Sequence, residues 1–208
     1  PEALFAKAAE VKAKLVYLAN PDNPMGSYHT GAEIVAAMDK LPNGTLLVLD
    51  EAYIECAPKD AALPLLFDDP RVIRMRTFSK VYGLAGARVG YALAAPDLIA
   101  QFEKVRNHFG MNRAAQAGAL EALGDGDWLR SVQARIVAAR LRIATIAKAN
   151  GLRALPSATN FVTIDCGRDG SFATRVLAET VARGIFARMP LAAPQNRCIR
   201  VSCGKPAD

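Results

Sequence analysis

Residues 72–94 read VIRMRTFSKVYGLAGARVGYALA, two apolar runs joined by a polar, glycine-containing loop. The first run, VIRMRTF at 72–78, is rich in β-branched and aromatic residues and predicts a buried strand. The second run, RVGYALA at 88–94, predicts another strand. One lysine, Lys80, stands just after the first strand, where the loop begins. We therefore expect a single amine at the carboxyl end of a buried strand.

Two further strands precede this stretch. KLVYLAN at 14–20 is an apolar run that ends in Asn-Pro, and TLLVLDEAY at 45–53 is an apolar run that ends in acids. Helical spacing at 30–41 separates them, and Thr30 followed by Glu33 predicts a capping box at the helix start. The apolar runs are continuous rather than alternating, which indicates strands covered on both faces. This pattern predicts an α/β fold with a mostly parallel sheet.

The pattern of predicted helices and strands changes after Pro96. DLIAQFEKVRN predicts a helix, and a second helical run extends from about 112 to 150, with a break near GDGD at 124–127. Gly151 is expected to end this run. Short strands and one helix then predict a second, smaller α+β domain: the strands are NFVTIDCG, GIFARMP and CIRVSCG, and the helix SFATRVLAETVAR lies between the first two.

Composition narrows the class of protein. Of the 208 residues, 51% are hydrophobic and 22% charged, which suits an ordinary globular core, and no apolar run is long enough to span a bilayer. The net charge of +6 comes from scattered basic residues, which argues against a nucleic-acid partner. Four cysteines without a CxxC pair disfavour zinc and a disulfide framework. We expect no metal and a cytoplasmic setting.

Polar residues follow each of the predicted strands. Ligands of a parallel sheet bind at the carboxyl ends of its strands, so these residues are the candidates for a site. A lysine there can form a Schiff base with an aldehyde cofactor, and pyridoxal phosphate supplies such an aldehyde. Lys80 meets that need. The cofactor also requires an acid on its ring nitrogen, and Asp50 at the end of the second strand fits.

The remaining needs of pyridoxal phosphate are donors to its phenolate oxygen and a clamp for its phosphate. Asn23, in the turn NPDNPMG, and Tyr53, in DEAY, fit the first need. The phosphate clamp is expected from Thr77, Ser79 and Arg88. Gly83, Gly86 and Gly90 do not form GxGxxG, so a dinucleotide site is not supported.

These residues stand in motifs that resemble a known family. NPDNPMG, DEAY, TFSK and GLAGARVG, in this order and spacing, resemble the fold type I pyridoxal-phosphate-dependent aminotransferases of class I/II, and most of all the histidinol-phosphate aminotransferases. The likeness continues through RNHFGMNRAAQAGALEAL, PSATNFV, ARGIFARMP and RCIRVSCG and covers nearly the whole chain. One motif alone is weak, but four in order are specific.

The resemblance implies a fold, an activity and roles. The fold would be that of the pyridoxal-phosphate-dependent transferases, with 1–123 as part of the large cofactor-binding domain and 124–208 as the small C-terminal domain. The activity would be transfer of an amino group, best from L-histidinol phosphate to 2-oxoglutarate, by ping-pong kinetics in a homodimer. Arg200 would bind the substrate anion, and Arg188 would help to hold the substrate phosphate.

The sequence also departs from the family pattern. Met25 replaces a common threonine in NPMG, with little effect expected. The chain begins where the family already has most of its first half, and it lacks the last helix, so we expect a fragment of the enzyme. Other readings stay open: an aminotransferase for aromatic or other amino acids, a phosphothreonine-type decarboxylase, or a transcription regulator with an aminotransferase-like domain.

Overall fold

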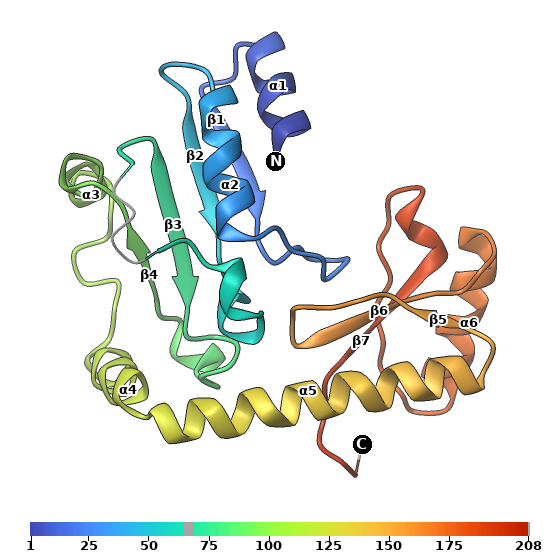
Figure 1. The fold of residues 1–208 in the computed structure, drawn as a ribbon. Helices are drawn as coiled ribbons and strands as arrows, with labels where there is room; N and C mark the ends of the chain where they lie inside the picture. Colours follow the sequence, from blue (N-terminus) through green and yellow to red (C-terminus); the bar gives the residue numbers. More distant parts are fainter. Residues whose placement is uncertain (65–68, 208) are drawn as a thin grey trace. The chain divides into compact units, whose positions relative to one another are not determined.

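The computed structural model describes residues 1–64 and 69–207, and it divides into two compact units (Figure 1). The first unit consists of Pro1–Pro21 and Tyr28–Leu129. The second consists of Asp22–Ser27 and Arg130–Asp208. The division therefore falls inside a long helix, and one short early segment belongs to the second unit.

A four-stranded sheet forms the centre of the first unit, in the order β1-β2-β3-β4. Strands β1 to β3 run parallel, and β4 runs antiparallel to β3, which confirms the predicted mostly parallel sheet. The register pairs Ala19 with Asp50 and Asp50 with Met75, so the carboxyl ends of these strands meet at one edge. The strands are β1 (Leu15–Ala19), β2 (Leu46–Asp50), β3 (Val72–Thr77) and β4 (Gly90–Leu93).

The helices of the first unit follow the predicted pattern. At the start of α2, the Glu33 amide donates to Thr30 Oγ1 at 3.2 Å and the Thr30 amide donates to Glu33 Oε2 at 2.7 Å, which confirms the capping box. The elements are α1 (Glu2–Glu10), α2 (Gly31–Ala37), α3 (Pro96–Glu103), α4 (Arg113–Gly124) and the 3-10 turns η1 (Met38–Lys40), η2 (Ile54–Cys56), η3 (Lys59–Ala61) and η4 (Ala85–Ala87).

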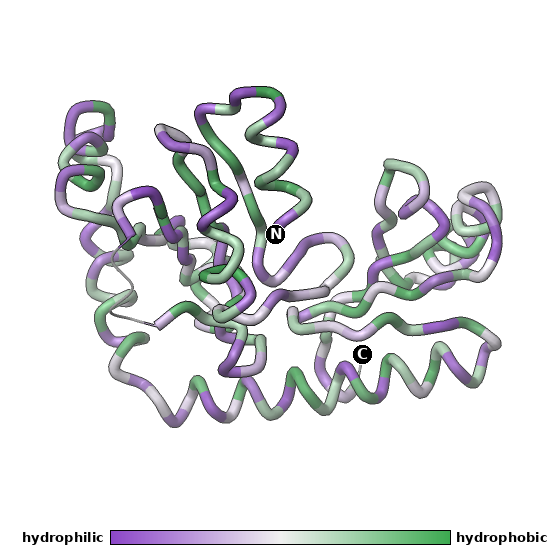
Figure 2. Tube along the Cα trace, turned by 45° about the horizontal axis from the view of Figure 1, so that its top comes forward, coloured by the Kyte–Doolittle hydropathy of each residue, from purple (hydrophilic) through white to green (hydrophobic). Residues whose placement is uncertain are grey.

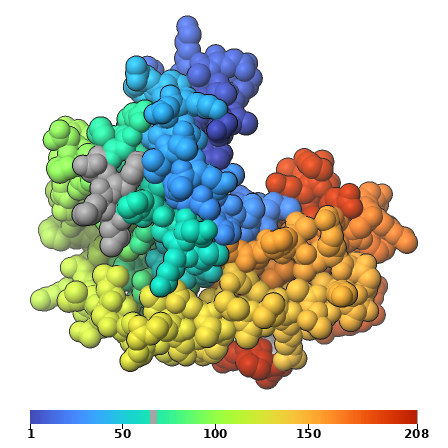
Figure 3. Space-filling view, in the orientation of Figure 1, coloured from blue at the N-terminus to red at the C-terminus, as the bar shows by residue number. Residues whose placement is uncertain are grey.

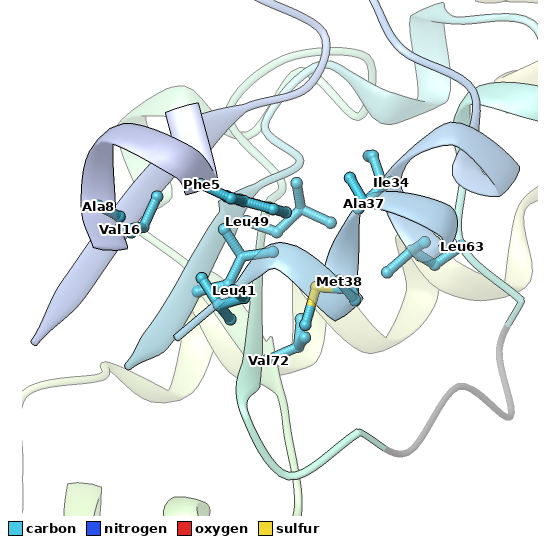
Figure 4. Close-up of a cluster of buried hydrophobic side chains, with 11 residues drawn as sticks. Phe5, Ala8, Val16, Ile34, Ala37, Met38, Leu41, Leu49, Leu63 and Val72 are labelled. Carbon is cyan, nitrogen blue, oxygen red and sulfur yellow. The ribbon is translucent and has the colours of Figure 1, made fainter. Parts of the chain in front are cut away.

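One face of the sheet carries the main hydrophobic core (Figure 4). Leu47 and Leu49 of β2 are fully buried there, and Phe5 of α1 joins them. On the other face, Leu15 and Tyr17 of β1 are each 56% exposed. Among the described residues one face is covered by helices, and the predicted cover of the second face stays a prediction.

A smaller cluster supports the loop that follows β3. Phe78 and Val89 pack with Ala115 and Ala119 of α4. The ring centroids of Tyr82 and Phe78 lie 5.0 Å apart with the rings tilted by 46°, and burial raises the pKa of Tyr82 to about 12. Helix α4 is thus the platform on which this loop rests.

The second unit is built on the antiparallel sheet β5-β6-β7. Helices α5 and α6 pack against it through Ala147 and Ala173, which are buried with Val162 and Ile199. Hydrophobic and hydrophilic residues alternate along α5, as Figure 2 shows. The elements are α5 (Gly126–Ala149), β5 (Arg153–Ala154), β6 (Phe161–Asp165), α6 (Gly170–Ala182), η5 (Gln195–Arg197) and β7 (Cys198–Ser202).

Two predictions for this part of the chain have clear outcomes. The break near 124–127 is confirmed, since α4 ends at Gly124 and α5 begins at Gly126. The predicted strand GIFARMP is wrong: the structure has only an isolated bridge between Arg188 and Arg200. Ile185 and Phe186 are 55% and 76% exposed, whereas Ala187 is buried, and the ladder does not extend beyond the bridge at Arg188.

The sequence also leads us to expect no membrane span, no metal site and no disulfide framework. Among the described residues, no helix combines the length and apolar character needed to cross a membrane. The same residues contain no group of three or more histidine, cysteine or acidic side chains that could hold a metal ion. All four cysteines are free, and three of them are buried.

Candidate active site

Asp50 ends β2 on the less covered face of the sheet, where its carboxylate is held by two donors. The amide of Ala52 donates to Oδ1 at 2.9 Å, and the hydroxyl of Tyr17, from β1, donates to Oδ2. The backbone carbonyl of Asp50 accepts from the amide of Asn20 at 2.9 Å. Asp50 is therefore fixed by its own turn and by the neighbouring strand. The contribution of Tyr17 was not expected from the sequence.

Glu51 lies on the opposite, covered face and is only 1% exposed. Its carboxylate accepts from Arg74 at 3.0 and 3.1 Å and from Arg76 at 2.7 Å. Burial alone lowers the pKa of Arg76, but the hydrogen bond and charge of Glu51 raise it above its usual value. The ion pairs join the end of β2 to β3. In the sequence, these ion pairs are indicated only by the two alternating arginines in the otherwise apolar strand VIRMRT.

Tyr53 and Lys80 come together at this edge. Tyr53 is 8% exposed, and the Nζ atom of Lys80 lies 5.0 Å from the centre of its ring. The ammonium group and the aromatic face attract each other at this distance. The structure thus places the candidate lysine beside the candidate tyrosine, one strand end away from Asp50.

Thr77 and Ser79 form a pair of hydroxyls just before Lys80. Thr77 Oγ1 lies 2.9 Å from Ser79 Oγ, and the Ser79 amide donates to Thr77 Oγ1 at 3.1 Å. Hydroxyl groups are suitable donors for an anion. The structure brings these two members of the predicted phosphate clamp together, and their role stays a prediction.

Arg88 occupies a left-handed backbone conformation, with φ of 55°, at the end of η4. Its Nη1 donates to the carbonyl of Ala85 at 2.9 Å. Within the described part of the chain, it makes no hydrogen bond to Thr77 or Ser79. The third member of the predicted clamp is thus near in sequence, but its guanidinium is engaged with its own loop.

The remaining candidates belong to the second unit. The guanidinium of Arg200, on β7, donates to Asn23 Oδ1 and lies 4.7 Å from the centre of the Phe161 ring. Asn23 is held in the turn NPDNPMG. In the space-filling view of Figure 3, the blue segment Asp22–Ser27 meets orange atoms of this unit. The pairing of Asn23 with Arg200 was not expected from the sequence.

Hydrogen bonds to the backbone carbonyls of that turn hold it against the sheet of the second unit. Thr163 Oγ1 donates to the Pro24 carbonyl at 2.5 Å, and the Ala158 amide donates to the Gly26 carbonyl at 2.8 Å. Gly26 has φ of +84°, and a Cβ there would lie 2.7 Å from Ser157 Oγ. Only glycine fits this position without displacing a neighbour.

Arg188 meets Arg200 through the backbone. Its amide donates to the Arg200 carbonyl at 3.1 Å, and the Arg200 amide donates to the Arg188 carbonyl at 2.6 Å. The guanidinium of Arg188 lies 5.7 Å from the ring centre of Phe186. The two predicted anion-binding arginines therefore sit opposite each other on adjacent segments.

The candidate residues thus form two groups, one in each unit. The first carries an acid, a phenol, an amine, two hydroxyls and a guanidinium at the carboxyl edge of the parallel sheet. The second carries an amide and two guanidiniums. The groups are Asp50, Tyr53, Thr77, Ser79, Lys80 and Arg88 in the first unit, and Asn23, Arg188 and Arg200 in the second.

The side chains of the first group lie at the edge of a mostly parallel sheet, which is the arrangement that the sequence motifs predict. The family model described as aminotransferase class I and II matches residues 2–208. The chain therefore belongs to the aminotransferase class I and II family, which confirms the family predicted from the motifs.

Relatives refine this result. A histidinol-phosphate aminotransferase of Anaeromyxobacter sp. (strain Fw109-5) is 42% identical over 182 residues, covering 85% of this chain and 49% of the relative. One from Geobacillus thermodenitrificans (strain NG80-2) is 37% identical over 201 residues, covering 95% of this chain and 54% of the relative. The chain spans about half the length of the curated relatives it matches.

A solved structure agrees in fold. The crystal structure of histidinol-phosphate aminotransferase from Sinorhizobium meliloti in complex with pyridoxal-5'-phosphate matches with a TM-score of 0.95 at 53% identity. The match covers 98% of this chain and 56% of that one. It confirms the predicted fold class.

Proposed function

We propose that the full-length protein is a pyridoxal-phosphate-dependent aminotransferase that takes its amino group from L-histidinol phosphate. The observation that carries this proposal is the group at the sheet edge, where Lys80 lies 5.0 Å from the ring of Tyr53 and one strand end away from the carboxylate of Asp50. The names of the relatives support the substrate.

The donor set fits this cofactor. Asp50 presents an anchored carboxylate for the ring nitrogen, and Tyr53 presents a phenol for the ring oxygen. Thr77 and Ser79 offer hydroxyls for the phosphate, and Arg88 adds a cation beside the same loop. When bound, the cofactor supplies an aldehyde and a ring that accepts electrons from the substrate α-carbon.

Lys80 has two tasks in this scheme. Its Nζ atom would hold the cofactor covalently through the aldehyde. As a free amine, the same nitrogen would accept the proton from the substrate α-carbon and give it up again, so Lys80 would act as base and acid. Asp50 would hold the ring nitrogen of the cofactor and keep it positively charged.

Arg200 and Arg188 bind the substrate anion. Guanidinium groups form two parallel hydrogen bonds to a phosphate or carboxylate, and two arginines on adjacent segments suit a phosphate. The bridge between their backbones keeps them together. 2-Oxoglutarate would be the amino acceptor, and the kinetics would be ping-pong because the two substrates would use one site in turn. We infer in addition that the protein acts as a homodimer in the cytoplasm.

The test uses the full-length protein loaded with pyridoxal phosphate. L-Histidinol phosphate is added without an oxo acid, and the visible absorption band is followed. We expect the band of the aldehyde form to give way to that of the amine form. The Lys80→Ala variant should lack the starting band and lose at least about 99% of turnover, because the base and the covalent attachment disappear together.

Lys59→Ala, at an exposed lysine of η3, is the matched control and should behave as the parent protein. Normal turnover in Lys80→Ala would refute the proposal. A band that ignores L-histidinol phosphate but responds to another amino acid would reassign the substrate. A response to phosphothreonine with release of carbon dioxide would indicate a decarboxylase. No band at all would favour a regulator.

A further inference from the structure

Tyr17 forms a hydrogen bond to Asp50, and the proposed function gives Tyr17 no role. It lies on β1, and although its side chain is 56% exposed, its hydroxyl donates to Oδ2 of Asp50. In the parallel register, Tyr17 pairs with Val48 and Ala19 pairs with Asp50. Side chains two residues apart in a strand point to the same face, so Tyr17 and Asp50 lie on one face of the sheet, with Asp50 two residues further along than the direct partner of Tyr17.

The carboxylate of Asp50 therefore has a donor on each oxygen, the Tyr17 hydroxyl on Oδ2 and the Ala52 amide on Oδ1. Each carboxylate oxygen has two acceptor positions, so one position on each oxygen stays available to a further donor. Two donors from different segments oppose rotation of the carboxylate about its last bond. The remaining acceptor positions thus have a defined direction before any ligand arrives.

We propose that Tyr17 is a positioning residue that aims the Asp50 carboxylate at the ring nitrogen of the cofactor. The inference rests on the proposed function of Asp50, and Tyr17 acts through that residue without touching the ring. Its effect is preorganisation: the orientation of the acceptor is set on folding rather than on binding.

The test compares Tyr17→Phe with the parent full-length protein. The variant keeps the ring and removes only the hydroxyl. Dissociation constants are measured by titration for pyridoxal phosphate and for an analogue whose ring nitrogen is replaced by a C–H group. We expect Tyr17→Phe to bind pyridoxal phosphate about threefold to tenfold more weakly, the loss typical of one hydrogen bond, and to bind the analogue as the parent does.

Two controls isolate the route through Asp50. Tyr91→Phe removes a hydroxyl from another strand of the same sheet, but Tyr91 pairs with Arg76, on the face opposite to that of Asp50, so cofactor affinity should not change. In an Asp50→Asn background, Tyr17→Phe should cost less than in the parent, because the group it positions no longer accepts the same bond.

The outcomes separate the two proposals. Equal affinity of Tyr17→Phe and the parent for pyridoxal phosphate would overturn the positioning role and leave the proposed function intact. An equal loss for the cofactor and for the nitrogen-free analogue would also overturn it, since a purely structural role predicts that result. If the parent and Asp50→Asn bind pyridoxal phosphate alike, the proposed role of Asp50 fails, and the role of Tyr17 fails with it.

Discussion

Glu51 forms ion pairs with two arginines that β3 carries on the covered face of the sheet. Arg74 is 2% exposed and also donates to the carbonyls of Leu63 and Pro64, so it cannot turn toward solvent without breaking several hydrogen bonds. A buried charge that loses its partner destabilises a protein strongly. The residue next to the proposed cofactor ligand is thus a structural anchor.

Replacing Glu51 by glutamine keeps the shape and removes the charge. We expect Glu51→Gln to lower the free energy of unfolding by about 3–5 kcal/mol, because Arg74 remains buried without a counter-ion. Urea unfolding followed by circular dichroism measures the effect. Glu10→Gln, which removes a surface pair with Lys7, is the control and should change stability by less than about 1 kcal/mol. Equal losses in both variants would contradict this assignment.

At the scale of elements, the hairpin of β3 and β4 positions the candidate residues that follow β3. Gly90 pairs with Thr77, and a Cβ at position 90 would lie 2.7 Å from the backbone oxygen of Arg76. The antiparallel strand can therefore approach β3 only if this residue has no side chain. The turn that returns the chain from Lys80 depends on that approach.

Gly90→Ala should push β4 away from the end of β3. Overpacking of this kind costs about 1–3 kcal/mol of stability, and here it displaces the strand end that carries Thr77. We expect a lower melting temperature and weaker binding of pyridoxal phosphate. Gly86→Ala, in η4 just before β4, is the matched control, since a Cβ there meets nothing within 4 Å. If Gly86→Ala is as damaging as Gly90→Ala, the close approach is not the cause.

Element-scale predictions from sequence succeed where the signal is local. The capping box of Thr30 and Glu33 and the break between α4 and α5 depend on a few neighbouring residues, and both are observed. The segment GIFARMP does not form the predicted strand. A strand needs a series of backbone hydrogen bonds to another segment, and among the described residues of GIFARMP only Arg188 forms a bridge. The two-residue strand β5 was too short to give a pattern.

For the whole molecule, each of the two units has its own sheet and its own hydrophobic cluster. In the second unit, Asp165 of β6 accepts from Arg153 of β5 at 2.8 Å and from Arg197, just before β7, at 2.8 Å. Burial alone raises the pKa of Asp165, but the donors Arg153, the Gly167 amide and Arg197 lower it to about 2. One carboxylate thus links all three strands of this sheet.

This link makes the second unit sensitive to acid. Because the pKa of Asp165 is lower in the folded chain than its usual value of 3.8, its stabilisation is fully present above about pH 4 and is lost as the pH falls through about 2. The side chain of Arg153 is 74% exposed and that of Arg197 is 43% exposed, so we expect a contribution of only about 1 kcal/mol after screening. Unfolding curves between pH 2 and 6 should show this loss, and Asp165→Asn should remove it. A variant with the same pH dependence as the parent would exclude Asp165 as the source.

The sequence by itself determined the family, the parallel α/β sheet and the identity of the residues at its edge. These follow from local patterns: apolar runs, turn residues and the motifs NPDNPMG, DEAY and TFSK. Only the tertiary structure decided which residues meet, namely Tyr17 with Asp50, Glu51 with Arg74, and Asn23 with Arg200. Such pairs depend on strand register and on contacts between distant segments, and no local pattern of residues encodes them.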